Sequence, residues 1–299
     1  MTRYDVLGVG SAAIDDIIYI RGIPPTDGKV AIVARSREFG GLIATALAAA
    51  ARLGATCHFA GLLGNDPDSI AVVRDLRRAG VVVPRRPICA DARPVTSTIV
   101  ASVDRGTRAL YFQTSPITGT PPAISERAVR SARVLLVDDY VVSRALSATQ
   151  IARSINIPVV ADFESLDKEG FPRLLQFVDH LILSAHFARE LTGTRGTTAP
   201  LRALWNNARK VVAITDGERG CWVATSDCGR VEHVPAYNVT PVDTNGCGDV
   251  FHGAYAAALS FGYPILRAIQ FASVAAALKA AHRGTRLGLP SRAEVEARL

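Results

Sequence analysis

The sequence predicts a three-layer, Rossmann-like α/β fold, in which a mostly parallel sheet carries helices on both faces. Beyond residue 134, short apolar runs alternate with helical stretches, as parallel strands do when crossover helices join them. A chain of 299 residues with 48% hydrophobic residues is long enough for such a core. The four expected strands lie at 134–137, 158–161, 180–183 and 211–214.

The N-terminal segment 5–13 predicts a first strand that ends in glycines. Its Gly8-x-Gly10-x-x-Ala13 spacing is that of a dinucleotide-binding fingerprint, which requires a helix to follow directly. Residues 16–20 continue instead as a β-branched strand, so this interpretation fails. Asp15 lies between the two segments, either as a turn cap or as part of a site.

Further strands are expected on both sides of an alanine-rich helix. Residues 29–39 alternate as a strand does, and Gly40-Gly41 then precede the helix, which runs to Leu53-Gly54. Two more strands are predicted at 95–103 and 108–112.

Capping residues predict where several helices begin and end. Asp68 is expected to cap one helix, and Gly80 to end it. Ser147-x-x-Gln150 and Ser291-x-x-Glu294 both have the spacing of a capping box.

Composition excludes several classes of protein. The net charge of +7 favours anionic ligands, but the arginines are spread along the chain without a basic stripe that would indicate nucleic acid binding. The N-terminus leads directly into a strand, and the longest apolar run, 44–51, is shorter than the roughly 20 residues that cross a bilayer. We therefore expect a cytoplasmic protein. The chain contains five cysteines, Cys57, Cys89, Cys221, Cys228 and Cys247. Their number is odd and they include no Cys-x-x-Cys pair, which argues against a disulfide framework and against a zinc site.

The most informative stretch is 243–249, Asp-Thr-Asn-Gly-Cys-Gly-Asp, which leads into a helical run. Gly246, Cys247 and Gly248 predict a tight turn whose backbone N–H groups and helix dipole bind an anion such as phosphate. Asp249 lies in the first helical turn, where it can take a proton from an acceptor hydroxyl. Glycine-rich turns also serve as packing devices, but the adjoining acid favours phosphoryl transfer.

These residues resemble signatures of the ribokinase-like (PfkB) sugar and nucleoside kinases. Residues 243–249 resemble the family's Asp-Thr-x-Gly-Ala-Gly-Asp, with Cys247 in place of alanine. Gly40-Gly41 resembles its Gly-Gly-x-x-x-Asn signature, with Thr45 at the asparagine position. Thr215-x-Gly217-x-x-Gly220 is similar to a third motif. Many relatives have Asn-x-x-Glu where this chain has Ser184, and in this respect it looks more like the ketohexokinase branch.

The resemblance implies two structural units. A nucleotide- and substrate-binding core is expected at 1–13, 39–92 and 116–299. A discontinuous β lid is expected at 14–38 and 93–115. Because exposed strand edges invite pairing, a homodimer through the lid is also expected.

The resemblance also implies ligands and site residues, with ATP as the phosphoryl donor. Substrate hydroxyls are expected at Asp15, Gly40, Gly41 and Thr45. Nucleotide is expected at Ser184, Thr215, Gly217, Gly220 and Ser273. A monovalent cation such as K⁺ lies behind the turn in some relatives, at the positions of Asp243 and Asn245. Independently of the resemblance, Asp162 and Glu164 follow a predicted parallel strand, where carboxylates and phosphate oxygens suit Mg²⁺.

We therefore expect a kinase that transfers the γ-phosphate of ATP to a hydroxymethyl group of a pentose or hexose, with Asp249 as general base. Three alternatives remain open. The acceptor is a nucleoside, or the chain is a weakened binding relative, as the changes at Thr45 and Ser184 suggest. The third is thiol chemistry at Cys247, since a helix N-terminus lowers a thiol pKa.

Overall fold

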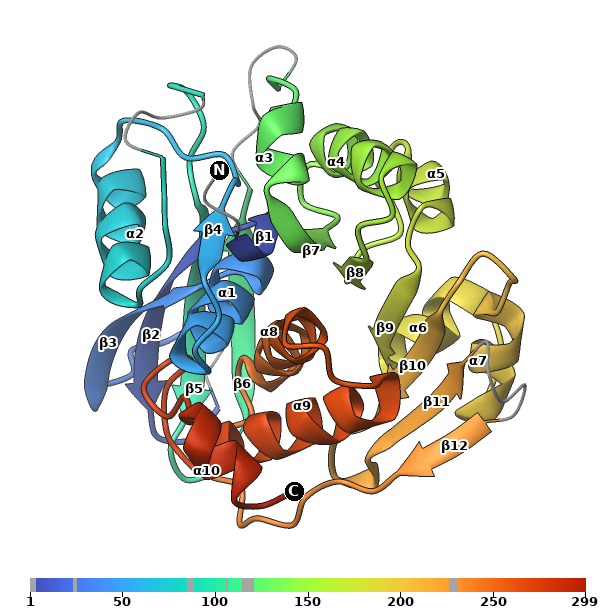
Figure 1. Cartoon of the computed structure of the whole chain (residues 1–299). Helices are drawn as coiled ribbons and strands as arrows, with labels where there is room; N and C mark the ends of the chain where they lie inside the picture. Colours follow the sequence, from blue (N-terminus) through green and yellow to red (C-terminus); the bar gives the residue numbers. More distant parts are fainter. Residues whose placement is uncertain (1–3, 24–25, 85–88, 106, 115–120, 226–230) are drawn as a thin grey trace.

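The computed structural model describes residues 4–23, 26–84, 89–105, 107–114, 121–225 and 231–299. An eight-stranded sheet forms the centre of the molecule, and a four-stranded sheet lies beside it (Figure 1). In the large sheet β10, β11 and β12 pair antiparallel, and all other pairs are parallel. In spatial order its strands are β12 (Val231–Val234), β11 (Cys221–Thr225), β10 (Val211–Thr215), β9 (His180–Ser184), β8 (Val159–Asp162), β7 (Ala132–Asp138), β1 (Tyr4–Val9) and β4 (Cys57–Phe59).

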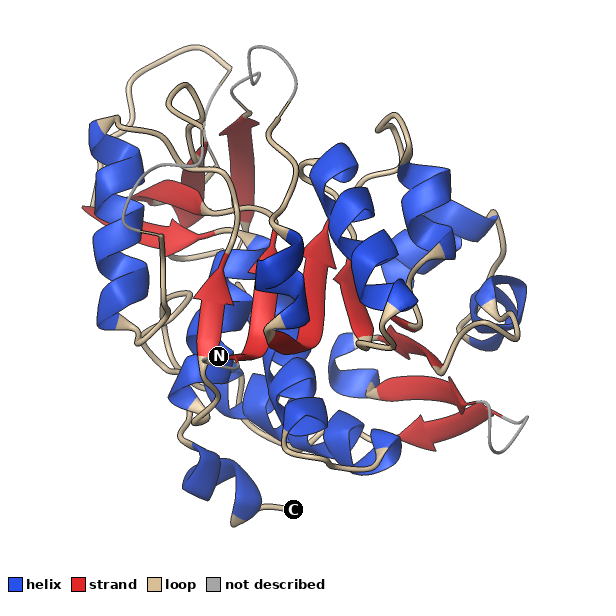
Figure 2. Ribbon diagram, turned by 45° about the horizontal axis from the view of Figure 1, so that its top comes forward, coloured by secondary structure: helices blue, strands red, loops and turns tan. Residues whose placement is uncertain are grey.

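Helices cover both faces of the large sheet, which confirms the predicted three layers (Figure 2). Along β7, Val134 and Leu136 belong to one core and Leu135 and Val137 to the other, because successive side chains of a strand point to opposite faces. The first core contains α1 (Leu42–Arg52), α2 (Pro67–Arg78), α8 (Cys247–Ser260), α9 (Ile265–Ala280) and α10 (Arg292–Glu296). The second contains α3 (Glu126–Arg130), α4 (Val142–Ser154), α5 (Phe171–Gln176), α6 (Ala185–Thr192) and α7 (Thr198–Leu204).

The small sheet combines two segments that lie far apart in the sequence. Its order is β3 (Ala34–Gly40), β2 (Ala13–Ile20), β5 (Val95–Ser102) and β6 (Arg108–Gln113), with β2 and β5 parallel. The strand expected at 29–39 begins only at Ala34, because its partner β2 ends at Ile20 and leaves the earlier residues without a strand to pair with. We call this sheet the lid.

The predicted helix ends are correct in two cases and wrong in two. The box at Ser291 caps α10, and Gly80 follows the end of α2 with a φ of 84°. The cap of α2 is Asp66 and not Asp68, because Pro67 has no N–H and fits the first helical position. Ser147 lies in the middle of α4, which begins at Val142 without a side-chain cap.

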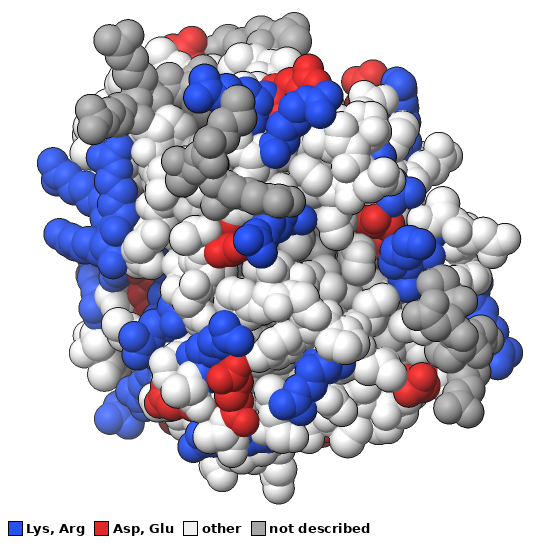
Figure 3. All heavy atoms as spheres, viewed as in Figure 1, with Lys and Arg blue, Asp and Glu red and all other residues white. Residues whose placement is uncertain are grey.

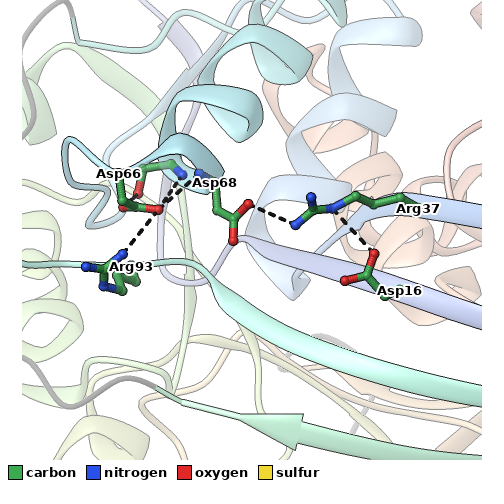
Figure 4. A network of polar contacts seen from close by, with 6 residues as sticks. Asp16, Arg37, Asp66, Asp68 and Arg93 are labelled. Atoms are coloured by element: carbon green, nitrogen blue, oxygen red, sulfur yellow. Dashed lines mark hydrogen bonds and ion pairs between the residues drawn. The ribbon is translucent and has the colours of Figure 1, made fainter.

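Ion pairs connect α2 to the lid (Figure 4). Arg37 of β3 lies 2.8 Å from Asp68 and 3.5 Å from Asp16 of β2. Arg93, just before β5, lies 3.7 Å from Asp66. Apart from Asp66, whose side chain is 10% exposed, these side chains are exposed, so each pair adds little stability. Together the pairs connect α2 to the lid strands.

The surface charge, the helices and the cysteines concern the three classes named above, which are nucleic-acid-binding, membrane-spanning and disulfide-bonded proteins. On the face seen in Figure 3, basic side chains gather along the left edge and are scattered elsewhere, where several lie beside acidic ones. Over the described residues, no helix has the length and apolarity that crossing a membrane requires. Cys57, Cys89, Cys221 and Cys247 are free thiols, and Cys228 lies outside the described residues.

Candidate active site

The glycine turn before α8 has the conformation that its sequence predicts. Gly246 is the N-cap of α8 with a φ of 76°, in the left-handed region that favours glycine, and a Cβ there would lie 2.8 Å from Cγ2 of Thr285. A Cβ on Gly248 would meet no atom within 4 Å, so this side of the turn is open. The backbone N–H of Cys247 donates to Thr244 at 3.3 Å. The open side of the turn leaves room for an anion at the positive end of the helix.

Close packing of α8 on α1 sets the position of this turn. A Cβ on Gly253 of α8 would lie 2.0 Å from the backbone oxygen of Ala46, so only glycine permits this approach. One residue earlier on α1, Thr45 Cγ2 lies 3.6 Å from the position that a Cβ on Gly246 would take. This packing holds the Gly40-Gly41 segment, which directly precedes α1, next to the glycine turn at residues 246–248.

Asp249 lies in the first turn of α8, half-buried among charged groups. Burial and repulsion from Asp162 and Glu164 raise its pKa well above the usual 3.8, while His252 and Arg286 act in the opposite direction. A carboxylate with a raised pKa is a better proton acceptor than an ordinary aspartate.

His252 lies one turn after Asp249 and is 4% exposed. Its Nδ1 lies 2.9 Å from the oxygen of Gly248 and 3.1 Å from Oδ2 of Asp162, and its Nε2 lies 3.0 Å from the oxygen of Ile182. Burial alone would lower the pKa of His252, but Asp162 and the two carbonyls raise it to about 9. The ring is therefore positively charged, with a proton on each nitrogen.

Asp15 and the two glycines meet on the lid side of the site. A Cβ on Gly40 would lie 2.5 Å from Oδ2 of Asp15, so the absence of a side chain lets the carboxylate approach this backbone. Gly41 has a φ of 88°, and a Cβ there would lie 2.5 Å from Cα of Ala12. Ser97 of β5 donates to Oδ1 of Asp15 at 2.5 Å. Burial raises the pKa of Asp15, and the Ser97 hydrogen bond opposes that rise.

Arg286 links the lid side to Asp249, and no sequence motif indicated it. Its guanidinium donates to Oγ1 of Thr45 at 3.3 Å, to the oxygen of Gly40 at 2.9 Å and to the carboxylate of Asp75. Burial lowers the pKa of Arg286 overall, and the charges of Asp75, Asp249 and Asp15 oppose that effect. Thr45 is fully buried, and its hydroxyl is already bonded to this arginine.

The predicted strand-end residues lie side by side at the carboxyl edge of the large sheet. Asp162 pairs in register with Ile182 of β9, and Ser184 of β9 pairs with Thr215 of β10. Ser184 is exposed and caps α6, where its Oγ accepts from the N–H of Phe187 at 3.1 Å. This edge is where parallel sheets bind ligands.

The turn after β10 contains two glycines with different roles. Gly217 begins the short 3-10 helix η1 (Gly217–Arg219) with a φ of 55°, and a Cβ there would meet nothing within 4 Å. A Cβ on Gly220 would lie 2.3 Å from the oxygen of Val234, so packing against β12 explains this glycine. Ser273 lies half-buried on α9.

The acidic cluster around Asp249 has the character of a site for a divalent cation. Desolvation and the like charges of Asp162 and Asp139 raise the pKa of Glu164 to about 7, although the residue as a whole is exposed. Oδ2 of Asp162 is buried and accepts no hydrogen bond from the described residues, although it forms an ion pair with His252 at 3.1 Å. No three His, Cys, Asp or Glu side chains in the described ranges form a complete metal site. The cluster thus fits Mg²⁺ that takes most of its ligands from phosphate and water.

The site expected for K⁺ does not fit a free ion. The backbone oxygens of Asp243 and Asn245 accept hydrogen bonds from Nζ of Lys279, a fully buried residue of α9. Two oxygens that a cation would use are therefore already bonded to an ammonium group.

Cys247 lacks the character of a reactive thiol. Burial raises its pKa, and the positive charge of Lys279 only partly opposes that rise. The thiolate is the nucleophilic form, so this environment disfavours thiol chemistry at the turn.

A polar chain links the turn to the lid. Glu38 of β3 accepts from the backbone N–H of Thr285 at 2.8 Å and from its hydroxyl at 3.1 Å. The amide of Asn245 in turn donates to Oγ1 of Thr285 at 3.0 Å. The two sides of the site are thus joined by hydrogen bonds as well as by packing.

Comparison with known proteins gives consistent matches over nearly the whole chain. The sequence model of the pfkB family carbohydrate kinases matches residues 4–292. The ribokinase of Bacillus subtilis strain 168 is 25% identical over 290 residues, which cover 96% of this chain and 97% of that protein.

Two solved structures show the same fold. A putative ribokinase from Agrobacterium tumefaciens superimposes with a TM-score of 0.91 at 29% identity, covering 99% of this chain and 97% of the other. Arabidopsis thaliana ribokinase, solved with ribose and ATP, gives 0.86 at 22% identity, covering 99% and 98%. The relatives reported above are ribokinases or putative ribokinases, and they do not support the expected likeness to the ketohexokinase branch.

Proposed function

Because the chain belongs to the pfkB family of carbohydrate kinases, and is thus a phosphotransferase with an alcohol acceptor, we propose that it phosphorylates a hydroxymethyl group of a small sugar with ATP. A pentose such as ribose is our first candidate, since the Bacillus subtilis relative is a ribokinase. Hexoses come second.

The position of Asp249 is the observation that carries this proposal. The carboxylate lies at the N-terminus of α8, beside the open glycine turn. Arg286 interacts with it electrostatically and also bonds to Gly40 on the acceptor side. A base between an anion-binding turn and a hydroxyl-binding surface has the arrangement that phosphoryl transfer to an alcohol requires.

In the proposed mechanism, Asp15 and the backbone of Gly40 and Gly41 hold the sugar hydroxyls. Asp249 accepts the proton of the attacking hydroxyl. The N–H groups of Gly246 and Gly248, together with that of Cys247, whose bond to the oxygen of Thr244 is 3.3 Å long, stabilise negative charge on the transferred phosphoryl group. Such stabilisation provides much of the acceleration in these reactions. Bound Mg²⁺, for which Asp162 and Glu164 are our candidates, would neutralise phosphate charge. For the nucleotide we propose Ser184, Thr215, Gly217, Gly220 and Ser273.

Asp249→Asn tests the proposal. Loss of a general base lowers kcat by about 10² to 10⁴ while ATP affinity is kept. ATP consumption is measured over a panel of pentoses, hexoses and nucleosides. Asp91→Asn is the matched control, because Asp91 is an exposed aspartate outside the proposed site. Equal rates in Asp249→Asn and wild type refute the assigned base.

The same panel separates the alternatives. Turnover confined to nucleosides identifies a nucleoside kinase of the family. Binding of sugar and ATP without turnover identifies a binding relative, for which the buried Thr45 is the motivating difference. The carboxylate of Asp249 at the N-terminus of α8, beside the open turn, favours an active kinase, because binding alone has little use for a proton acceptor.

We further propose a homodimer through the lid, whose bounds we take as 14–38 and 93–115. Within the described part of the chain the strand β6 pairs with β5 alone, and it exposes Leu110, Tyr111 and Phe112 by 49%, 63% and 68%. Apolar side chains on an open edge strand favour pairing with a second copy. Sedimentation should give a dimer for wild type and a monomer for Phe112→Asp; a wild-type monomer contradicts the proposal.

A further inference from the structure

Lys279 is a buried cation with an unusual set of partners. It lies in the last turn of α9 with 0% of its surface exposed. Its Nζ lies 2.9 Å from the backbone oxygen of Asp243 and also bonds to that of Asn245. Among the described residues it has no carboxylate oxygen within 4.0 Å, so its direct partners are backbone oxygens. Burial of an ammonium without a carboxylate is costly, and an apolar residue at this position would avoid that cost.

The bonding partners of this ammonium are those of a free monovalent cation. Backbone carbonyl oxygens are the ligands with which proteins replace the hydration shell of K⁺. The ammonium has the same single charge and is a compact donor on a flexible stem. Asp243 and Asn245 directly precede Gly246, so the charge lies behind the turn that opens α8. It also acts at the turn, because it opposes the effect of burial on Cys247.

The end of α9 fixes the same segment by further bonds. The N–H groups of Val242 and Asp243 donate to the oxygen of Ala280 at 2.7 and 3.0 Å. Oδ2 of Asp243 accepts from the N–H of Gly284 at 3.0 Å. The segment is therefore held on both sides by covalently attached groups of this chain.

We propose that the ammonium of Lys279 is a built-in monovalent cation, which fixes residues 243–245 and adds positive charge to the phosphate-binding turn. The enzyme then needs no free K⁺. Lys279 is on this account a positioning residue and does not touch the substrate. The inference rests on the kinase function proposed above, but its test includes a measurement that needs no turnover.

The wild-type enzyme provides the first test. Its kcat/KM and its Kd for ATP are measured in potassium, sodium and tetramethylammonium chloride at equal ionic strength. At constant screening we expect differences below about twofold. An activation of about tenfold or more by K⁺, the size of effect expected for one lost electrostatic contact, overturns the proposal.

Variants of Lys279 provide the second test, with the exposed Lys210→Ala as control. In tetramethylammonium chloride, Lys279→Ala should lose about tenfold or more in kcat/KM, because the turn loses its positive charge. K⁺ or NH₄⁺ should restore part of the lost kcat/KM in Lys279→Ala. These ions should also raise the Tm of Lys279→Ala but not that of the wild type or the control, since an ion that binds only the folded state stabilises it. The Tm shift tests the cation site even if the acceptor is misidentified.

Lys279→Met, which keeps the length of the side chain, separates charge from packing. It should weaken ATP binding without rescue by K⁺. Unchanged kcat/KM and ATP affinity in Lys279→Met overturn the proposal. If neither variant folds, the salt series on the wild-type enzyme decides.

Discussion

Replacement of His252 by asparagine should remove a pH-dependent part of the stability. Both ring nitrogens lie within 3.1 Å of an oxygen, so the folded state requires the doubly protonated ring. Burial opposes the charge, but Asp162 and the carbonyls of Gly248 and Ile182 raise the pKa from 6.5 to about 9. The variant has no group that titrates at this position.

The expected magnitude follows from the two pKa values. A tenfold change in a protonation equilibrium is worth about 1.4 kcal/mol, so a rise from 6.5 to about 9 corresponds to about 3 kcal/mol. Because the folded pKa is the higher one, this stabilisation is fully present below pH 6.5 and is lost as the pH rises to about 9.

Urea unfolding of both proteins at pH 6 and pH 8.5 measures this effect. The difference in their free energies of unfolding should shrink by about 2 kcal/mol between the two pH values. Carboxyl groups such as Asp138, whose pKa burial raises to about 7, titrate in both proteins, so the difference between the proteins is the relevant quantity. His186→Asn, at a histidine whose side chain is 89% exposed, is the control. A difference that stays constant with pH refutes a charged His252.

Three further predictions concern the same helix and its surroundings. In Glu164→Gln, one negative charge that repels Asp249 is lost, so the pKa of Asp249 should fall. Since Asp249 must be ionised to act as the base, the acidic limb of the kcat/KM profile should move to lower pH. Arg286→Gln should move the acidic limb to higher pH, because a positive charge that lowers the pKa of Asp249 is lost. If the acidic limb lies at the same pH in Glu164→Gln and Arg286→Gln, this account is contradicted. Gly253→Ala places a Cβ 2.0 Å from a carbonyl of α1 and should cost about 1–3 kcal/mol of stability. Gly248→Ala is the control, because a Cβ at that position meets nothing within 4 Å and urea unfolding should find no loss of stability. Equal losses of stability in Gly253→Ala and Gly248→Ala refute the packing argument.

The central strands are predictable from the sequence because both of their faces are buried. In β7 every residue from Val134 to Val137 lies at 0 or 1% exposure, so the strand reads as one apolar run. Helix ends are predictable only where a side chain makes the cap. Ser291 does so, whereas α4 begins after Val141 without any side-chain cap, and the pattern at Ser147 was misleading.

The candidate site was predictable where its residues are contiguous. The turn at 243–249 and the glycines at 40–41 are local patterns. Arg286 and Glu38 belong to the site only because the lid, α1 and the segment after α9 meet there. Lys279 had a signal in retrospect, since it interrupts an apolar helix, as did His252, which lies on one face of α8 with Asp249.

The parallel pairing of β2 with β5 has a consequence for how the protein folds. Asp15 and Ser97 are 82 residues apart in sequence, yet they are hydrogen-bonded. Closing a loop of that length costs about 4 kcal/mol of chain entropy, and structure that forms within the loop reduces this cost. We expect the intervening α1, β4 and α2 to pack first, so that Asp15 reaches its place late. During synthesis the surface that we propose for substrate hydroxyls would then form only after the core has begun to form.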